Sequence, residues 1–387
     1  MSKLPLSGIT VLELGSSIAG PFAGVVLADL GAEVLKVEQP VHGDPARGWG
    51  DERLGGTGVT YQAYNKDKRS IVADFTDPAD LEQLRRLMAE RVDVVLQNLR
   101  PGVVERFGLD AATAMAANPR LIYCNLAAFG AKGPLKDLPG YDPLIQAFSG
   151  IIDATGEPGR DPVRVGVPLI DIGTGMWATI GILAAIRRRD NEDRGCLVDA
   201  AMFDTALAWQ SLSFAILEGG GTPPRRTGLK GAVLVPNTGY DTADGKLLIT
   251  IGTEKQFRRF CQALGRPEIA DDPRFATNNA RIDNVEAFGE TISDILRRQP
   301  RAHWSEQLNA VDVPNAPLLS LAEVIGHEQT AASEMLQTSP DGTFRLIGLP
   351  LRFDGERPPF RRASPELGEA TQEVFAFMAD DGRLQSA

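Results

Sequence analysis

The chain has 387 residues, of which 43% are hydrophobic and 24% are charged, and its formal net charge is −11. This length exceeds the size at which one hydrophobic core usually stops growing, so we expect a globular protein of two domains. The acidic balance excludes sequence-independent binding to nucleic acid or to an anionic membrane, because both need an excess of lysine and arginine.

The first part of the chain alternates short apolar strands with helices. The strands are rich in β-branched residues, and the helices show apolar residues at helical spacing and proline at the first helical position. Strands separated by helices of this length indicate a mostly parallel sheet covered on both faces, which is an α/β fold. We expect strands at 9–15, 32–38, 70–75, 92–98 and 120–126, and helices at 21–31 and 77–90.

The remainder of the chain contains more helix. The polar, proline-containing segment 222–230 indicates the end of the first domain. Helices are expected from about residue 173 and over 198–221, 254–264, 284–298, 302–310 and 364–380, with a strand over 344–353 and a hairpin over 240–253 that turns at Asp244 and Gly245.

A glycine-containing turn joins the first strand to the first helix. The sequence GSSIAGPFAG at 15–24 would cradle phosphate in a dinucleotide-binding fold, with Glu38 as the ribose acceptor. Its spacing is GxxxxG rather than GxGxxG, so a plain tight turn is the favoured interpretation. A nicotinamide-dependent oxidoreductase is a distant alternative.

Two basic clusters occur in this acidic chain. Lys66, Lys68 and Arg69 lie in a polar loop before a strand, and Arg100 and Arg106 follow the end of another strand, where open α/β sheets bind ligands. Taken alone, the first cluster reads as a solvated charge run. Together, the clusters indicate a local site for a phosphate-bearing ligand.

Two segments place carboxylates beside apolar stretches. In GYDPLIQAFSG, the ordinary interpretation is that Asp142 caps a helix and Tyr141 packs with its hydroxyl hydrogen-bonded. Asp171 lies just before the expected helix start, where free N–H groups and the helix dipole favour an anion. Capping explains an aspartate there, but the N–H groups of Gly173 and Gly175 would also face a developing oxyanion. Asp171 is therefore a candidate nucleophile.

Cysteine and histidine usage excludes several other sites. The three cysteines are far apart with no CxxC pair, and the three histidines are dispersed. We therefore expect no disulfide framework and no metal site. The N-terminus lacks the features of a signal peptide, and no stretch has 18 consecutive apolar residues, so we expect a cytoplasmic protein.

In combination, these motifs resemble the class III CoA-transferase family of the CaiB/BaiF type. This family includes formyl-CoA transferase, carnitine CoA-transferase and α-methylacyl-CoA racemase. The combination in this order is highly specific and extends over nearly the whole chain. It consists of LSGITVLELGSSIAGPFAGVVLADLGAEVLKVEQP, GDPARGW, NKDKRSI, VLQNLRPGVVERFGL, GYDPLIQA, LIDIGTGMWATIGILAAI and LGEATQEVF.

The resemblance implies a CoA-transferase in which Asp171 is the catalytic nucleophile. Asp171 would attack an acyl-CoA thioester to give a mixed anhydride and CoA thiolate, and the thiolate would return to form an aspartyl-CoA thioester. The incoming carboxylic acid would then repeat these steps in reverse. Coenzyme A and acyl-CoA are thus substrates, and no tightly bound cofactor is expected.

Further site residues carry over from the family position by position. Tyr141 and Gly173 are expected to line the substrate end of the site. The expected CoA-binding residues are Ser17, Ile18, Gln39, Ala73, Thr76, Asn98, Leu99, Arg100, Arg106, Pro139, Gly140 and Tyr141.

Three of these positions depart from the family pattern. Gln39 stands where arginine is frequent and Thr76 where some members have lysine, which shifts phosphate or adenine contacts toward Arg100. The racemases carry histidine at the position of Tyr141, and without it racemisation lacks half of its acid/base pair. Transfer is therefore preferred, and an α-methylacyl-CoA racemase or epimerase is the alternative.

The resemblance also implies an architecture. The family has a Rossmann-like large domain built from both chain ends, a smaller α+β domain, and an interlocked homodimer. On this basis residues 1–220 begin the large domain, 221–330 form the linker and small domain, and 331–387 complete the large domain. The expected partners are an acyl-CoA, a carboxylic acid and a second copy of the chain, without nucleic acid or membrane.

Overall fold

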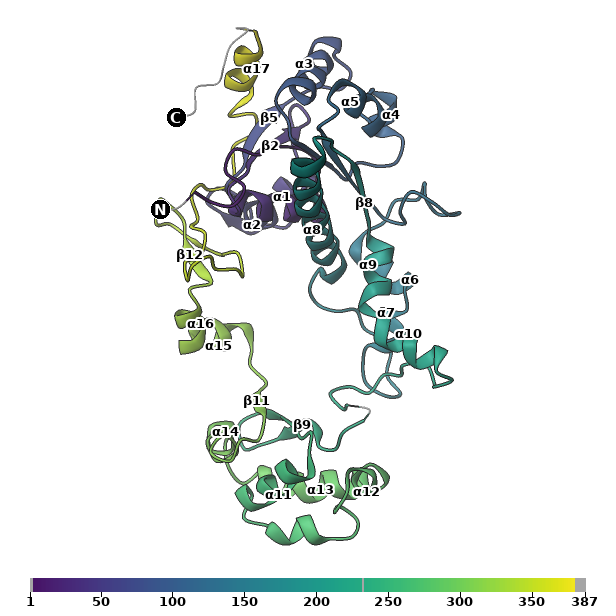
Figure 1. Ribbon diagram of the computed structural model, residues 1–387. Helices are drawn as coiled ribbons and strands as arrows, with labels where there is room; N and C mark the ends of the chain where they lie inside the picture. The colour runs from purple at the N-terminus through teal and green to yellow at the C-terminus, as the bar shows by residue number, and fades with distance from the viewer. Residues whose placement is uncertain (1–2, 232, 380–387) are drawn as a thin grey trace. The chain divides into compact units, whose positions relative to one another are not determined.

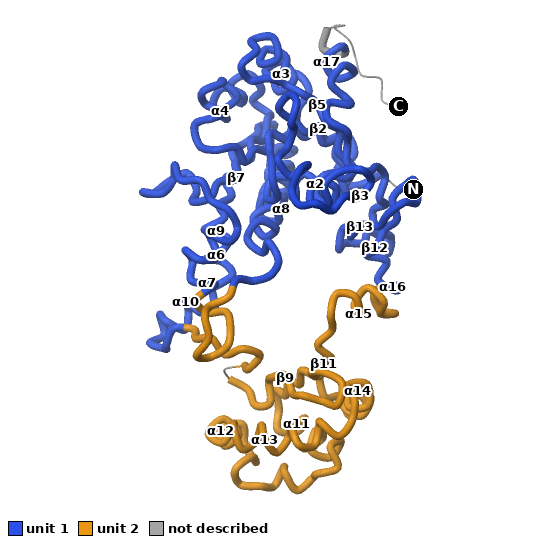
Figure 2. Tube along the Cα trace, turned by 180° about the vertical axis from the view of Figure 1, so that it is seen from behind, with its two compact units in different colours: residues 1–152, 164–223, 331–387 blue, residues 153–163, 224–330 orange. Residues whose placement is uncertain are grey.

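The computed structural model describes residues 3–231 and 233–379 of the chain. The chain divides into two compact units, which Figure 2 shows in different colours. The first unit contains residues 1–152, 164–223 and 331–387, and the second contains residues 153–163 and 224–330. Segments from both halves of the chain therefore build the first unit.

A six-stranded parallel sheet forms the centre of the first unit (Figure 1). Its order is β5-β2-β1-β6-β7-β8, and each pair of neighbours is parallel. The inner strands are almost entirely buried, as expected where helices cover both faces of a sheet. The predicted parallel α/β fold is confirmed. The strands are β1 (Thr10–Leu14), β2 (Glu33–Glu38), β5 (Arg69–Val72), β6 (Val94–Gln97), β7 (Ile122–Ala127) and β8 (Leu197–Ala201).

Side chains that alternate along the strands build a separate core on each face of the sheet. On one face, Val11 and its neighbours pack against α1 and α8. On the other face, Leu12 and its neighbours pack against α3, α5 and α17. The C-terminal helix is thus part of the first unit. These helices are α1 (Ala19–Asp29), α3 (Pro78–Glu90), α5 (Ala111–Ala117), α8 (Leu169–Glu192) and α17 (Thr371–Ala379).

Among the described helices, only α8 is long and apolar enough to cross a membrane. Half of its most apolar window is buried inside the protein, where Ala178, Ile182 and Ala185 pack in the core of the first unit. The apolar character of α8 is therefore explained by its place in the core.

The second unit has its own core around a three-stranded antiparallel sheet of order β11-β10-β9. Phe257, Phe260 and Phe288 pack together there with Trp304. The predicted hairpin and helices of this region are confirmed. The elements are β9 (Asn237–Asp241), β10 (Lys246–Thr250), α11 (Glu254–Ala263), η2 (Pro267–Asp271), α12 (Asn278–Asp283), α13 (Val285–Leu296), α14 (Arg301–Asn309), β11 (Asn315–Pro317) and α15 (Leu321–Gly326).

Three predicted elements were wrong in extent or type. The long helix over 198–221 is instead β8 followed by α9 (Met202–Trp209) and α10 (Ser211–Glu218), because the first residues pair with β7 at the sheet edge. The strand over 344–353 shortens to β13 (Arg345–Ile347), which pairs with β12 (Leu336–Thr338). The closing helix begins at Thr371 instead of residue 364. Position 380, its predicted end, lies outside the described residues.

Short elements complete the chain. They are η1 (Pro45–Gly48), β3 (Arg53–Leu54), β4 (Thr57–Gly58), α2 (Val59–Asn65), α4 (Val103–Arg106), α6 (Asp142–Phe148), α7 (Ile151–Ala154) and α16 (Glu328–Ser333).

Candidate active site

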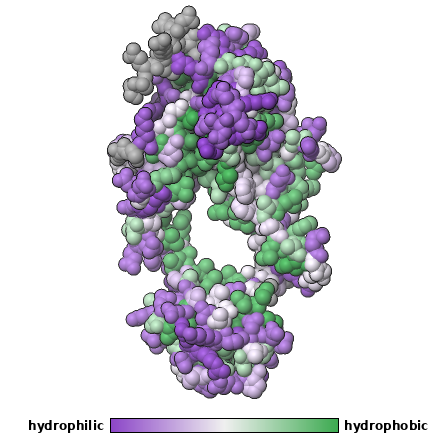
Figure 3. Space-filling model, in the orientation of Figure 1, coloured by the Kyte–Doolittle hydropathy of each residue, from purple (hydrophilic) through white to green (hydrophobic). Residues whose placement is uncertain are grey.

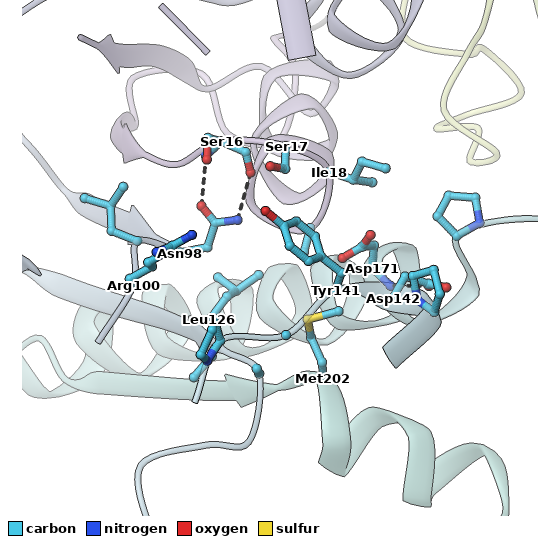
Figure 4. A pocket seen from close by; sticks show the side chains of 18 of the residues that line it. Ser16, Ser17, Ile18, Asn98, Arg100, Leu126, Tyr141, Asp142, Asp171 and Met202 are labelled. Carbon is cyan, nitrogen blue, oxygen red and sulfur yellow. Dashed lines mark hydrogen bonds between the residues drawn. The ribbon is translucent and has the colours of Figure 1, made fainter. Parts of the chain in front are cut away.

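A cavity of about 770 Å³ lies beyond the carboxyl ends of β1, β6 and β7. Parallel α/β sheets bind their ligands at this edge. Every residue that lines the cavity belongs to the first unit. Figure 4 shows Arg100 and Asn98 on one side of the view and Asp171 and Asp142 on the other.

The turn between β1 and α1 forms one wall of the cavity. The Asn98 side chain accepts a hydrogen bond from the Ser16 N–H at 2.9 Å and donates one to the Ser16 carbonyl at 2.9 Å (Figure 4). Ser17 has a φ of 71°, a left-handed conformation that is uncommon outside glycine, and its N–H donates to Asp44. Asn98 therefore clamps the turn that places Ser17 and Ile18 on the cavity wall.

Buried ion pairs surround the base of this turn, where β1 ends. Lys36 Nζ lies 2.9 Å from Asp44 Oδ2 and 2.9 Å from Glu13 Oε1, while Lys68 Nζ lies 2.7 Å from Glu13 Oε2. Burial raises the pKa of Glu13, but the charges of Lys36 and Lys68 outweigh burial and lower that pKa below its ordinary value. Loss of one partner would leave a buried charge uncompensated. The paired charges therefore hold the turn in one position.

The basic loop before β5 does not supply a phosphate site, and that prediction was wrong. Lys66 and Lys68 are buried and pair with Asp29 and Glu13, while Arg69 pairs with acids on β2 and α17. The acids come from distant parts of the chain, so the spacing of the basic residues does not reveal that they are paired.

Glu38, the ribose acceptor of the dinucleotide alternative, is also fully engaged. It accepts hydrogen bonds from Arg47, from the hydroxyl groups of Tyr61 and Ser70, and from the Asp44 N–H. Burial raises the pKa of Glu38, but these donors, led by Arg47, bring it down to about 2. The acid that the dinucleotide interpretation requires is therefore committed to internal contacts.

Asp171 lies in the first turn of α8, which begins at Leu169, four residues earlier than predicted. The Asp142 carboxylate accepts the N–H groups of Ile170 at 2.6 Å and Asp171 at 3.1 Å, and it accepts a third hydrogen bond from Gln146. The capping interpretation of Asp142 is thus confirmed, although it caps α8 and not the helix that it begins. Capping by Asp171 itself is wrong.

The Asp171 carboxyl group is partly buried in the cavity wall. No side chain of the described residues donates a hydrogen bond to it. Burial, followed by the negative charge of Asp142, raises its pKa from the ordinary value of 3.8 to about 7. A carboxyl group with a perturbed pKa inside a cavity is typical of a functional site.

Gly173 and Gly175 serve packing, and the prediction that their N–H groups face an oxyanion was wrong. They lie beyond the first turn of α8, where N–H groups bond to carbonyls of the helix itself. A Cβ at Gly173 would lie 2.8 Å from Trp209 Cζ2, and one at Gly175 would lie 2.8 Å from the Ala19 carbonyl oxygen. The two glycines therefore let α9 and α1 approach α8 closely.

The structure brings most of the predicted site residues together. A second cavity of about 550 Å³ adjoins the first one and shares Ser16, Leu99 and Val103 with it, and Gln39 and Ala73 line this second cavity. The predicted residues on the wall of the first cavity are Ser17, Ile18, Asn98, Leu99, Arg100, Pro139, Gly140, Tyr141 and Asp171.

Three predicted residues line neither cavity. The Thr76 hydroxyl donates to Asp74, and the Arg106 guanidinium lies 4.9 Å from the centre of the Phe107 ring. Gly173 is buried against α9. Their predicted contacts with ligand remain predictions.

Sequence reasoning missed many residues of the cavity wall, among them Trp49, Arg164 and Met202. Trp49 ends the GDPARGW motif, where a tryptophan in a polar loop was an available signal. Arg164 lies in an irregular segment, and Met202 lies in the segment that was read as one long helix, so neither gave a signal of its own.

Comparison with known proteins identifies the family. The sequence profile of CoA-transferase family III matches residues 6–371. The chain belongs to this family. It is 36% identical to the acetyl-CoA:oxalate CoA-transferase of Acetobacter aceti over 379 residues, which covers 97% of this chain and 96% of that protein. It is also 36% identical to the succinate–glutarate CoA-transferase of Agrobacterium fabrum over 386 residues, which covers 97% and 96% of the two chains.

A solved structure supports the same assignment. A CAIB/BAIF family protein from Brucella suis has a TM-score of 0.88 and 36% sequence identity, and the match covers 97% of this chain and 99% of that one. The predicted resemblance to the CoA-transferases is confirmed, and CoA transfer is the activity of the family to which this enzyme belongs.

Proposed function

We propose that this family III enzyme moves CoA from an acyl-CoA thioester to a free carboxylic acid and that Asp171 is its covalent nucleophile. The observation that carries the proposal is a difference between the two carboxylates on the cavity wall. Asp142 accepts three hydrogen bonds, whereas Asp171 accepts none from the described side chains. Asp171 is therefore the acid whose oxygens are available to a substrate.

The reaction proceeds in two halves. An Asp171 oxygen attacks the thioester carbonyl, the carbon–sulfur bond breaks, and the products are a mixed anhydride and CoA thiolate. The thiolate then attacks the aspartyl carbonyl of the anhydride, which releases the donor acid as a carboxylate and leaves an aspartyl-CoA thioester. An incoming carboxylate repeats the two steps in reverse and leaves as the new acyl-CoA, with Asp171 restored.

The surroundings of Asp171 suit this chemistry. Partial burial removes part of its hydration, so the ionised carboxylate is more reactive than one in bulk water, and it keeps water from the anhydride. A held thiolate returns without the entropic cost of a second encounter. The clamped turn at Ser17 and the cation of Arg100 line the same cavity and are proposed to bind the CoA moiety.

The names of the relatives suggest a class of acid. They refer to oxalate and to succinate and glutarate, which are all dicarboxylic acids. We extend this class to the present chain, so that the acceptor is a dicarboxylate and the donor is an acyl-CoA.

The direct test is to trap the aspartyl-CoA thioester. Wild-type protein mixed with acyl-CoA donors and no acceptor is expected to gain the mass of CoA minus water on a peptide that contains residue 171. Asp171→Asn should not form this adduct and should lose CoA exchange, while its circular dichroism spectrum stays unchanged. Exchange at the wild-type rate in Asp171→Asn would disprove the covalent role.

A second experiment addresses the racemase alternative. Deuterium incorporation at the α-carbon of a branched acyl-CoA, without acceptor and without a CoA adduct, would indicate proton abstraction instead of transfer. Tyr141 lines the cavity and would then be the residue to replace by phenylalanine.

We further propose that two copies of the chain associate as an interlocked homodimer, as the family resemblance implies. Helix α10 has no buried residue, although Leu212, Phe214 and Ile216 are large apolar side chains exposed to solvent. Figure 3 shows hydrophobic side chains reaching the surface in this region. Contiguous exposed apolar surface is typical of an interface. Light scattering is expected to give twice the mass of the chain, and a monomer at micromolar concentration would contradict the proposal.

A further inference from the structure

Two cationic side chains line the first cavity, Arg100 and Arg164. Arg100 follows β6 and lies beside Asn98 and the β1–α1 turn. Arg164 lies on another part of the chain, in the segment 164–168 that leads directly into α8. Every residue of this segment lines the cavity, as does Asp171. The two arginines therefore come from different segments of the cavity wall, and only the segment of Arg164 leads to Asp171.

Hydrogen bonds fix the segment that carries Arg164 to the helix start that carries Asp171. The Val165 N–H donates to Gln146 Oε1 at 2.9 Å, and Gln146 Nε2 donates to Asp142 Oδ1. Asp142 in turn accepts the Asp171 N–H. Gln146 and Asp142 are buried, so one internal network holds the backbone beside Arg164 and the backbone of Asp171.

Apolar packing holds the segment as well. Val165 is partly buried against a cluster that includes Ile145, Ile151 and Ile170. Ile170 directly precedes Asp171. The apolar packing and the hydrogen-bond network that hold the segment therefore both reach the start of α8. Arg164 thus emerges from a fixed piece of backbone, whereas its own side chain is exposed to solvent.

Among the described residues, none forms a hydrogen bond or an ion pair with the Arg164 guanidinium. No carboxylate of the described residues forms an ion pair with it, in contrast to the paired cations of the basic loop. An arginine without a partner on the wall of a cavity, close in sequence to the reacting carboxylate, is suited to bind an anion that enters with the substrate. Guanidinium groups match carboxylates in a planar, two-point contact.

We propose that Arg164 binds the remote carboxylate of a dicarboxylic acid whose other carboxyl group reacts at Asp171. It is a specificity-determining residue and takes no part in bond making. This inference rests on the proposed function, because it assumes that the acyl group reacts at Asp171. It assigns the remote charge of the acid to Arg164 and leaves the CoA phosphates to the end of the cavity near Arg100.

Pairs of thioesters of equal length test the proposal. Succinyl-CoA and butyryl-CoA differ by one terminal carboxylate in place of a methyl group, and malonyl-CoA with propionyl-CoA and glutaryl-CoA with valeryl-CoA form the pairs of other lengths. The rate of aspartyl-CoA formation is measured by intact-protein mass spectrometry in single turnovers without acceptor. The variants are Arg164→Gln, Arg164→Lys and the control Arg188→Gln, which removes an exposed arginine of α8 away from the cavity.

We expect wild-type protein to prefer the carboxylate-bearing thioester of at least one pair by tenfold or more. Arg164→Gln should reduce that preference to less than twofold by slowing only the charged thioester, Arg164→Lys should retain part of it, and Arg188→Gln should match wild type. Equal loading of both members of every pair by wild type, or equal slowing of both members by Arg164→Gln, would overturn the proposal. Failure of wild type to load any thioester would instead contradict the role of Asp171.

Discussion

The carboxylate of Asp142 accepts the backbone N–H of Asp171 at 3.1 Å, so one acid caps the helical turn that holds the other. The arrangement has two consequences for Asp171. It fixes the backbone of the residue, and it brings a negative charge close enough to raise the pKa of its carboxyl group. Asp142 thereby controls both the backbone position of Asp171 and the pKa of its carboxyl group.

The first prediction concerns pH. Because the Asp171 pKa is raised to about 7, first by burial and then by Asp142, kcat/KM should rise with pH along an acidic limb centred near that value. Asp142→Asn keeps an acceptor oxygen for the helix but removes the charge, so the limb should move to lower pH. Asp190→Asn, an exposed acid further along α8, is the control. An acidic limb that stays in place in Asp142→Asn would show that the charge of Asp142 does not act on the Asp171 carboxyl group.

The second prediction concerns stability. The Asp171 pKa is higher in the folded state than the 3.8 of a free carboxyl group, so folding loses stability as pH rises from about 4 to 7. The complete shift would correspond to about 4 kcal/mol, and partial exposure to solvent reduces this to an expected gain of about 2 kcal/mol for Asp171→Asn at pH 8. The gain should vanish near pH 4. Urea unfolding at the two pH values measures it, and a variant less stable than wild type at pH 8 would contradict the assigned environment.

The third prediction separates two arginines that the family resemblance treats alike. Arg100 lines the cavity, whereas Arg106 does not. Loss of a hydrogen bond to a charged group costs about 1.5–3 kcal/mol, so Arg100→Gln should raise the KM for acyl-CoA by about tenfold or more. Arg106→Gln should change it by less than about threefold on the same scale. Steady-state kinetics with one acyl-CoA and both variants decides the matter, and a larger effect at Arg106 would reverse the assignment.

The fourth prediction tests the contact between α8 and α1. A Cβ at Gly175 would meet the Ala19 backbone oxygen at 2.8 Å and the Phe22 ring at 2.9 Å, and backbone atoms yield little. Gly175→Ala should therefore destabilise the protein by about 2 kcal/mol. In α13, Gly289 has no atom within 4 Å of an added Cβ, so Gly289→Ala should gain about 0.5–1 kcal/mol from helix propensity. Equal effects of the two changes in thermal unfolding would contradict the close helix contact.

Local sequence patterns were sufficient for five of the six strands of the large sheet. Strands such as 92–98 and 120–126 are apolar because both faces of a parallel sheet are buried, and that requirement is visible in one segment at a time. The pattern failed at 198–221, because an edge strand leading into two short helices has the same composition as one long amphipathic helix. Only pairing with β7 distinguishes the two.

The candidate nucleophile was also recognisable, since an aspartate before glycines in an apolar run is unusual and belongs to a motif in known order. The sequence by itself determined the family, the parallel sheet and the segment that carries Asp171. The tertiary structure decided which charges are free. Lys68 and Glu38 looked available along the chain, but folding pairs them with distant residues. Arg164 gave no signal in the sequence, yet it lines the cavity and forms no ion pair within the part of the chain that the structure describes. The physical reason is that burial forces charges to find partners, and those partners come from parts of the chain that only the fold brings together.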